Sequence, residues 1–258
     1  MEILIAVSVL GGAALLLGFL LSLASKIFAV KTDEKEASIR EALPGANCGA
    51  CGFAGCDSYA KAVSDGSSKP SLCIPGGKDT AAKIGEILGV AVEVKEKRAV
   101  VLCNGTCDKA QTKYEHSGKP SCAAAALVQG GPKACNFGCM GFGDCALVCD
   151  YNAITITDGI AHIDHSLCIG CGKCVNICPK HIIKVFDLPI KATVMCLNKD
   201  KGAIARKLCS VSCIGCGLCK KNCPNDAITL SDNLAIIDPV KCTACGKCIS
   251  VCPQKTIK

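Results

Sequence analysis

The sequence contains no tryptophan, and aromatic residues make up only 3% of its 258 residues. A core filled mainly by large aromatic side chains is therefore excluded. The sequence also lacks a G-x-G-x-x-G fingerprint and a G-x-x-x-x-G-K-[ST] loop, and its few histidines form no set with Ser and Asp. These absences exclude a chain that performs hydride transfer or nucleophilic hydrolysis with its own residues.

Cysteine, in contrast, is abundant, with 25 copies in the chain. An odd number cannot pair completely into disulfides. Many of these cysteines are separated by only two or three intervening residues, and this spacing suits a shared metal centre better than a disulfide bridge. We therefore expect metal ligation in a compartment that keeps thiols reduced.

An apolar segment near the N-terminus, residues 3–24, contains no charged residue. A helix of this length, at about 1.5 Å per residue, would cross a hydrocarbon core of about 30 Å. Lys26 and Lys31 follow it, which predicts that the rest of the chain lies in the cytoplasm. We expect residues 1–25 to form a single-pass anchor in the cell membrane, because Glu2 argues against a cleaved secretory signal.

The first cysteine group lies in a glycine-rich segment. Three cysteines fall within nine residues, and sixteen further residues separate the third from the fourth. This spacing predicts one [4Fe–4S] cluster in a small domain over residues 26–90, and it differs from the two separated pairs that are typical of zinc sites. The predicted ligands are Cys48, Cys51, Cys56 and Cys73.

An internal repeat with an offset of 74 residues occupies most of the remaining chain. YNAITITDGIAHID at 151–164 aligns without a gap with NDAITLSDNLAIID at 225–238, and cysteine motifs flank both copies. The alternating apolar residues predict two short strands and a turn in each copy. The expected fold is therefore small α+β domains, with tandem bacterial-ferredoxin-like modules over 135–187 and 188–258 and a connecting segment over 91–134.

Three of the cysteine motifs have the regular spacing C-x2-C-x2-C-x3-C-P. In this pattern the first three cysteines ligate one iron–sulfur cube, and the fourth ligates the neighbouring cube. The predicted ligand sets are Cys149, Cys168, Cys171 and Cys174; Cys213, Cys216, Cys219 and Cys252; and Cys223, Cys242, Cys245 and Cys248.

The fourth motif is irregular, because Phe142 stands where the repeat has Cys216, and Asp150 replaces Pro224. Either Cys135 supplies the missing ligand, or this cluster has only three irons. We favour the first alternative, since it leaves the cube fully ligated. The predicted ligands are then Cys135, Cys139, Cys145 and Cys178.

Five thiols remain without an assignment: Cys103, Cys107, Cys122, Cys196 and Cys209. Cys103, Cys107 and Cys122 could join one more cysteine in a sixth cluster, or the five could be inert buried thiols. The sequence thus predicts at least five [4Fe–4S] clusters and leaves a sixth open.

The formal net charge of +7 counts the cysteines as neutral. An oxidised four-iron core with four thiolates carries about −2, so five clusters would bring the net charge to about −3. Nucleic-acid binding is therefore not expected. The basic pairs at 97–98, 206–207 and 220–221 could dock an acidic redox partner, or they could simply be solvated.

The chain resembles the B subunits of Rnf complexes in the order of three parts. These are an apolar N-terminal segment, the cysteine segment GANCGACGFAGC with Cys73, and ferredoxin motifs toward the C-terminus. The resemblance implies an electron relay within an ion-translocating ferredoxin:NAD oxidoreductase. It implies soluble ferredoxin as the donor, and other membrane and peripheral subunits that reduce NAD and move Na⁺ or H⁺. Short family members have a single ferredoxin pair, whereas this chain has two.

Overall fold

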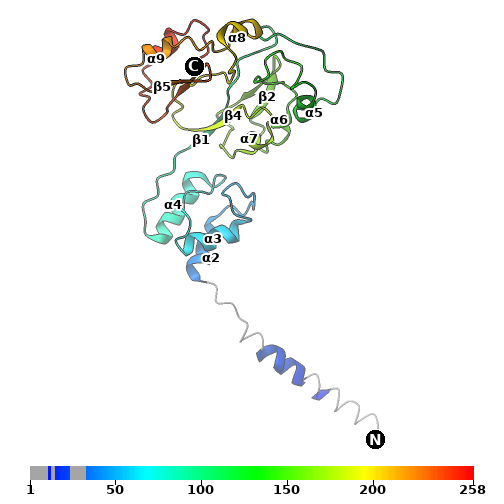
Figure 1. Cartoon of the computed structure of the whole chain (residues 1–258). Coiled ribbons are helices and arrows are strands. Elements are labelled where there is room, and N and C mark those ends of the chain that lie inside the picture. The colour runs from blue at the N-terminus through cyan, green and yellow to red at the C-terminus, as the bar shows by residue number, and fades with distance from the viewer. Residues whose placement is uncertain (1–10, 13–14, 24–32) are drawn as a thin grey trace.

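The computed structural model describes residues 11–12, 15–23 and 33–258 (Figure 1). None of the helices in these residues combines the length and the apolar character needed to cross a bilayer. The prediction of a transmembrane helix over 3–24 is corrected by this finding. A span needs about 20 consecutive residues, whereas the described helical residues here are 11–12 and 15–23, and the other positions of the predicted anchor lie outside the described residues.

The N-terminal domain is a unit of three helices, which Figure 1 shows beside the larger cysteine-rich lobe. Asp33 caps the first helix by accepting a hydrogen bond from the amide of Lys35, and Gly89 ends the last one in the left-handed conformation, with φ of 68°. Fully buried Ile39, Tyr59 and Ile84 form the core between the helices. The helices are α2 (Glu34–Ala42), α3 (Cys56–Ser64) and α4 (Gly77–Leu88).

The larger lobe is built from short two-stranded antiparallel sheets and helices of four to seven residues. Strand β1 pairs with β4, β2 with β3, and β5 with β6. The strands are β1 (Lys97–Val101), β2 (Ile154–Thr157), β3 (Ile160–Ile163), β4 (Ile183–Asp187), β5 (Ile228–Ser231) and β6 (Leu234–Ile237). The helices are α5 (Cys122–Leu127), α6 (Asp144–Leu147), α7 (Lys173–Ile177), α8 (Gly202–Leu208), α9 (Leu218–Lys221) and α10 (Lys247–Ser250).

The sequence repeat is also a structural repeat. Ile154 pairs with Ile163 in the first module, and Ile228 pairs with Ile237 at the corresponding positions of the second. The expected small α+β ferredoxin-like architecture is confirmed. Strand β1 comes from the segment expected to be a connector, because its apolar residues pair with β4 and close the first module.

Cysteine side chains take core positions that aromatic residues fill in other proteins. Cys139, Cys145 and Cys174 lie among the buried apolar residues of the first module, and Cys219 and Cys248 do so in the second. The scarcity of aromatic residues therefore reflects cores organised around thiols.

Candidate metal centres

All 25 cysteines are free thiols. Among the residues that the structure describes, no three Cys, His, Asp or Glu side chains converge closely enough to hold a single metal ion. The thiols instead surround apolar cavities, and five of these cavities are each lined by four cysteines.

The cavity of the N-terminal domain has a volume of about 320 Å³ and is lined by Cys48, Cys51, Cys56 and Cys73. Asn47 Oδ1 accepts a hydrogen bond of 2.8 Å from the amide of Cys56 and so shapes the ligand loop. The buried Tyr59 hydroxyl donates to Lys69 O and accepts from the amide of Leu72, which fixes the chain just before Cys73. The structure thus brings together the four residues that the sequence grouped here.

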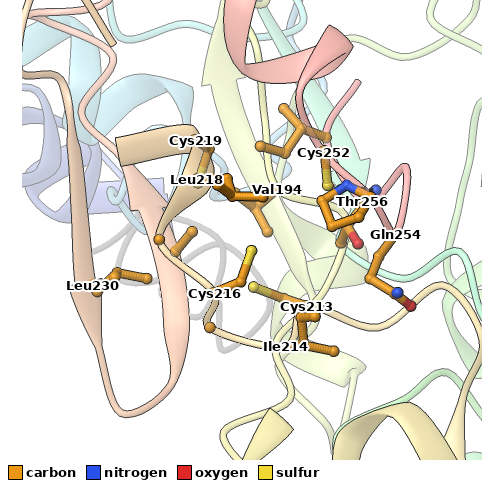
Figure 2. A pocket seen from close by; sticks show the side chains of 15 residues that line it. Val194, Cys213, Ile214, Cys216, Leu218, Cys219, Leu230, Cys252, Gln254 and Thr256 are labelled. Atoms are coloured by element: carbon orange, nitrogen blue, oxygen red, sulfur yellow. Dashed lines mark hydrogen bonds between the residues drawn. The ribbon is translucent and has the colours of Figure 1, made fainter. Parts of the chain in front are cut away.

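Two cavities lie in the second module. One, of about 380 Å³, is lined by Cys213, Cys216, Cys219 and Cys252 (Figure 2). The other, of about 340 Å³, is lined by Cys223, Cys242, Cys245 and Cys248. Figure 2 shows the sulfur atoms of Cys213, Cys216 and Cys252 turned into the first cavity. The fourth cysteine of each motif therefore lies with the other motif's first three, as the exchange pattern predicts.

Backbone amides point at several of these sulfur atoms. The amide of Ala227 donates to Cys223 Sγ at 3.3 Å, and that of Thr256 donates to Cys252 Sγ at 3.4 Å. Such N–H···S bonds stabilise a negatively charged thiolate or cluster and tune its potential.

Cys149, Cys168, Cys171 and Cys174 also lie near one another in the first module. Burial raises the pKa of Cys174 to about 11, and the nearby Cys168, Cys171 and Cys149 contribute to this rise. The amide of Ala99 in β1 donates to Cys168 Sγ at 3.4 Å. The connector strand therefore contributes to this site as well as to the sheet.

The cavity at the irregular motif includes a cysteine from outside the repeat. A cavity of about 380 Å³ is lined by Cys122, Cys139, Cys145 and Cys178. Burial raises the pKa of Cys145 to about 12, with further contributions from Cys139, Cys122 and Cys178. Cys122, and not Cys135, is the fourth thiol here.

Asp144 holds Cys122 in this place. Its carboxylate, at the start of α6, accepts hydrogen bonds of 3.0 Å from Ser121 Oγ and from the amides of Cys122 and Ala123. These two amides belong to the free N–H groups at the N-terminus of α5. Phe142, which occupies the regular ligand position, packs against the cluster of Cys122, Ala125 and Met140.

Cys135 lines a different cavity, of about 380 Å³, together with Cys103, Cys196 and Cys209. Cys107 is exposed and does not line any of the five cavities. The alternative in which Cys103, Cys107 and Cys122 share a site is therefore not the arrangement in the structure.

The donor set fits iron–sulfur clusters. Burial raises the pKa of Cys196 to about 12 and that of Cys139 to about 11, so four thiolates would not be stable together in these apolar cavities without cations. Iron supplies that positive charge, and soft thiolates are its ligands in such clusters. The cysteine sets, the apolar walls and the N–H···S donors all suit a buried anionic cube.

Comparisons with known proteins agree with this chemistry. The family model described as "Putative Fe-S cluster" matches residues 43–75, the "4Fe-4S binding domain" matches 161–184, and the "4Fe-4S dicluster domain" matches 212–256. The B subunit of the Na(+)-translocating ferredoxin:NAD(+) oxidoreductase complex of Acetobacterium woodii is 44% identical over 92% of this chain and 72% of the relative. The chain belongs to the family of these Rnf complex B subunits.

Two further relatives extend the similarity over more of their own length. The B subunit of the proton-translocating ferredoxin:NAD(+) oxidoreductase complex of Clostridium ljungdahlii is 42% identical over 92% of this chain and 83% of that protein. The B subunit of the ion-translocating oxidoreductase complex of Methanosarcina acetivorans is 37% identical over 98% of this chain and 96% of that protein. The resemblance to the Rnf B family is thereby confirmed.

Proposed function

We propose that this chain is the electron-transfer subunit of an ion-translocating ferredoxin:NAD⁺ oxidoreductase complex, in which it takes single electrons from reduced ferredoxin and passes them to partner subunits. The observation that carries this proposal is the succession of neighbouring four-cysteine sites through one chain. The names of the relatives support the same activity. The chain has no nucleotide motif, so NAD reduction belongs to other subunits.

We assign five [4Fe–4S] clusters, four of them to cavities lined by motif cysteines and the fifth to the group of Cys149, Cys168, Cys171 and Cys174. When bound, each cluster supplies reversible one-electron transfer. The assigned ligand sets are Cys48, Cys51, Cys56 and Cys73; Cys149, Cys168, Cys171 and Cys174; Cys122, Cys139, Cys145 and Cys178; Cys213, Cys216, Cys219 and Cys252; and Cys223, Cys242, Cys245 and Cys248.

Thiols of different sites lie near common side chains. Burial raises the pKa of Tyr151, and Cys171 of the repeat and Cys48 of the N-terminal domain both add to this rise. Burial also raises the pKa of Cys145, and Cys174 of the neighbouring site adds to that rise. This proximity supports electron transfer between successive sites.

We place the ferredoxin contact on the second module. Cys216 and Cys245, one from each of its sites, are exposed. Exposed Lys220 and Lys221 end α9, and Lys247 begins α10. Positive charge beside solvent-facing clusters complements an acidic electron carrier and speeds encounter.

Ion movement is assigned to the other subunits of the complex. The relatives' names specify sodium in one case and protons in another, and both fit a subunit that handles only electrons. Ion translocation takes place at a membrane, so we place this chain at a membrane by its association with those subunits.

Anaerobic purification with iron and sulfide counting, followed by stopped-flow mixing with reduced ferredoxin, tests the proposal. We expect at least about 20 irons per chain, four per cluster, and rapid bleaching of the cluster absorbance. NAD⁺ alone should not reoxidise the reduced chain. Zinc in place of iron, or NAD⁺ turnover without partner subunits, would contradict the proposed role.

A further inference from the structure

We propose that Cys103, Cys135, Cys196 and Cys209 bind a sixth [4Fe–4S] cluster, which joins the two ferredoxin-like modules into one electron path. This inference rests on the proposed function as an electron relay. The four cysteines line a single cavity of about 380 Å³ together with apolar Leu102, Met195 and Leu197. Cys135 and Cys209 are only 9% and 7% exposed, so the site is buried between the modules.

The site has internal symmetry, because each module contributes two equivalent cysteines. Cys135 and Cys209 are separated by the 74 residues of the repeat. Cys103 and Cys196 each follow a valine that occupies an equivalent backbone-pairing position in its module. Val101 pairs with Ile183, Val194 bridges to Ile257, and each cysteine comes two residues after its valine.

The backbone groups near the sulfur atoms repeat with the same symmetry. The amide of Cys139 donates to Cys103 Sγ at 3.4 Å. At the equivalent place, the backbone of Cys213 favours the Cys196 thiolate and so acts to lower the pKa of Cys196. Cys139 and Cys213 are ligands assigned to neighbouring clusters, one in each module. A ligand of a cluster site in each module therefore lies next to this cavity.

A second backbone contact is also duplicated. The backbone of Phe137 favours the Cys135 thiolate, and that of Val211 favours the Cys209 thiolate, and each acts to lower the pKa of its cysteine. Backbone N–H groups repeated in this way suit the sulfur atoms of a bound cluster.

An orphan donor provides independent support for a bound group. Asn198 lines the cavity and is fully buried, and its Nδ2 has no hydrogen-bond partner among the described residues. Its Oδ1 accepts from the amide of Asp200 at 2.8 Å, which fixes the orientation of the amide group. A buried N–H without a partner is costly, and a cluster sulfur would satisfy it.

Lys133 adds positive charge at the same cavity. It is 7% exposed, and its Nζ donates to Gly105 O at 2.7 Å and to Gly159 O at 2.8 Å. A buried cation is favourable next to an anion, and a cube with four thiolates carries a net negative charge.

The relay step needs no additional reactant. A cluster held by these four cysteines would accept one electron from a reduced cluster of the second module and would give that electron to the first module, so oxidation and reduction balance. No bond forms or breaks, and no proton is required.

Cys196→Ala and Cys209→Ala test the assignment, with Cys107→Ala as the matched control. We expect about 24 irons per chain in the wild type and the control, and about 20 to 23 in each test variant, depending on whether the cluster is lost or converted to a three-iron form. EPR of the reduced protein should lose one cluster signal and its coupling to neighbours. Equal iron content in Cys196→Ala and wild type would overturn the sixth cluster, whereas a wild type without iron would overturn the proposed function itself.

The bridging role has its own kinetic readout. On mixing with reduced ferredoxin, we expect the Cys196→Ala protein to fill only the two clusters of the second module in the fast phase. The other clusters should be reduced at least about tenfold more slowly than in the wild type. Unchanged rapid reduction of all remaining clusters would exclude a bridging position.

Asn198→Asp changes the surroundings of the proposed cluster without removing a cysteine ligand. The variant retains the acceptor for the Asp200 amide but replaces the orphan donor with a carboxylate oxygen, which disfavours the reduced cluster. We expect one of the six midpoint potentials to fall and five to stay unchanged. Gln129→Glu, at an exposed position after α5 that is not within two residues of any assigned ligand, is the control for charge alone, and six unchanged potentials in Asn198→Asp would overturn the assignment.

Discussion

The two ferredoxin-like modules share a backbone but obtain their ligands differently. In the second module, eight cysteines from two regular motifs line two cavities. In the first, Phe142 takes the place of a ligand, and Cys122 on α5 lines that cavity instead. The segment between Cys103 and Cys135 has 31 residues, against 12 between Cys196 and Cys209, and this longer segment contains α5.

The comparison shows that the position of a thiol around the cavity matters more than its place in the motif. Asp144 in the first module binds the N-terminus of α5 and brings Cys122 to the cavity. Its equivalent in the second module is the apolar Leu218, which cannot accept such hydrogen bonds, and α8, the helix in the segment between Cys196 and Cys209, contains no cysteine. The longer segment therefore compensates for the irregular motif.

The largest effect is expected from Cys122→Ala. Removing the fourth thiol should remove one cluster or convert it to a three-iron form, with a loss of about one to four irons per chain. Cys216→Ala, at the position equivalent to Phe142, should cause a loss of the same size in the second module. Iron counting and EPR of the oxidised and reduced proteins measure both losses.

A rescue variant distinguishes ligand loss from general damage. Phe142→Cys combined with Cys122→Ala restores the regular spacing of the motif, and we expect it to recover the full iron content. Cys107→Ala serves as the unaffected control. If Cys122→Ala alone retained wild-type iron and EPR spectra, the borrowed-ligand description of the first module would fail.

The regular motifs could be read from sequence because their spacing alone specifies which sulfur atoms share a cube. In the N-terminal domain and in the second module, each set of four cysteines that the spacing groups together lines one cavity. The repeat also predicted both β-hairpins, since Ile154 and Ile228 begin equivalent strands. These features depend on residues close together in the chain.

Ligands that come from distant segments could not be assigned in this way. Cys122 reaches its cavity through the hydrogen bonds of Asp144, which leave no mark in the spacing. Cys135 fits its own motif by distance along the chain, yet it faces Cys209 across the module boundary. The alignment of Cys135 with Cys209 was visible in the sequence, but only the packing of the modules shows that the two residues meet.

A smaller effect is expected from Lys133, whose equivalent in the second module is the exposed Lys207. Lys133→Met leaves Gly105 O and Gly159 O without their buried donor, and we expect a loss of about 2 kcal/mol in the free energy of unfolding. Lys207→Met should change it by less than about 0.5 kcal/mol. Anaerobic denaturant titration compares the two, and equal effects would show that this asymmetry between the modules has no energetic consequence.

The smallest effect concerns the surface, where exposed Lys220 and Lys221 of the second module correspond to Ala146 and Leu147 of the first. Reversing both charges in Lys220→Glu/Lys221→Glu should slow reduction by ferredoxin by about tenfold at low salt. The difference should shrink at about 1 M salt, where the screening length is about 3 Å. Lys83→Glu on the exposed face of α4 should leave the rate unchanged, and a double variant as fast as wild type at low salt would move the ferredoxin contact away from the second module.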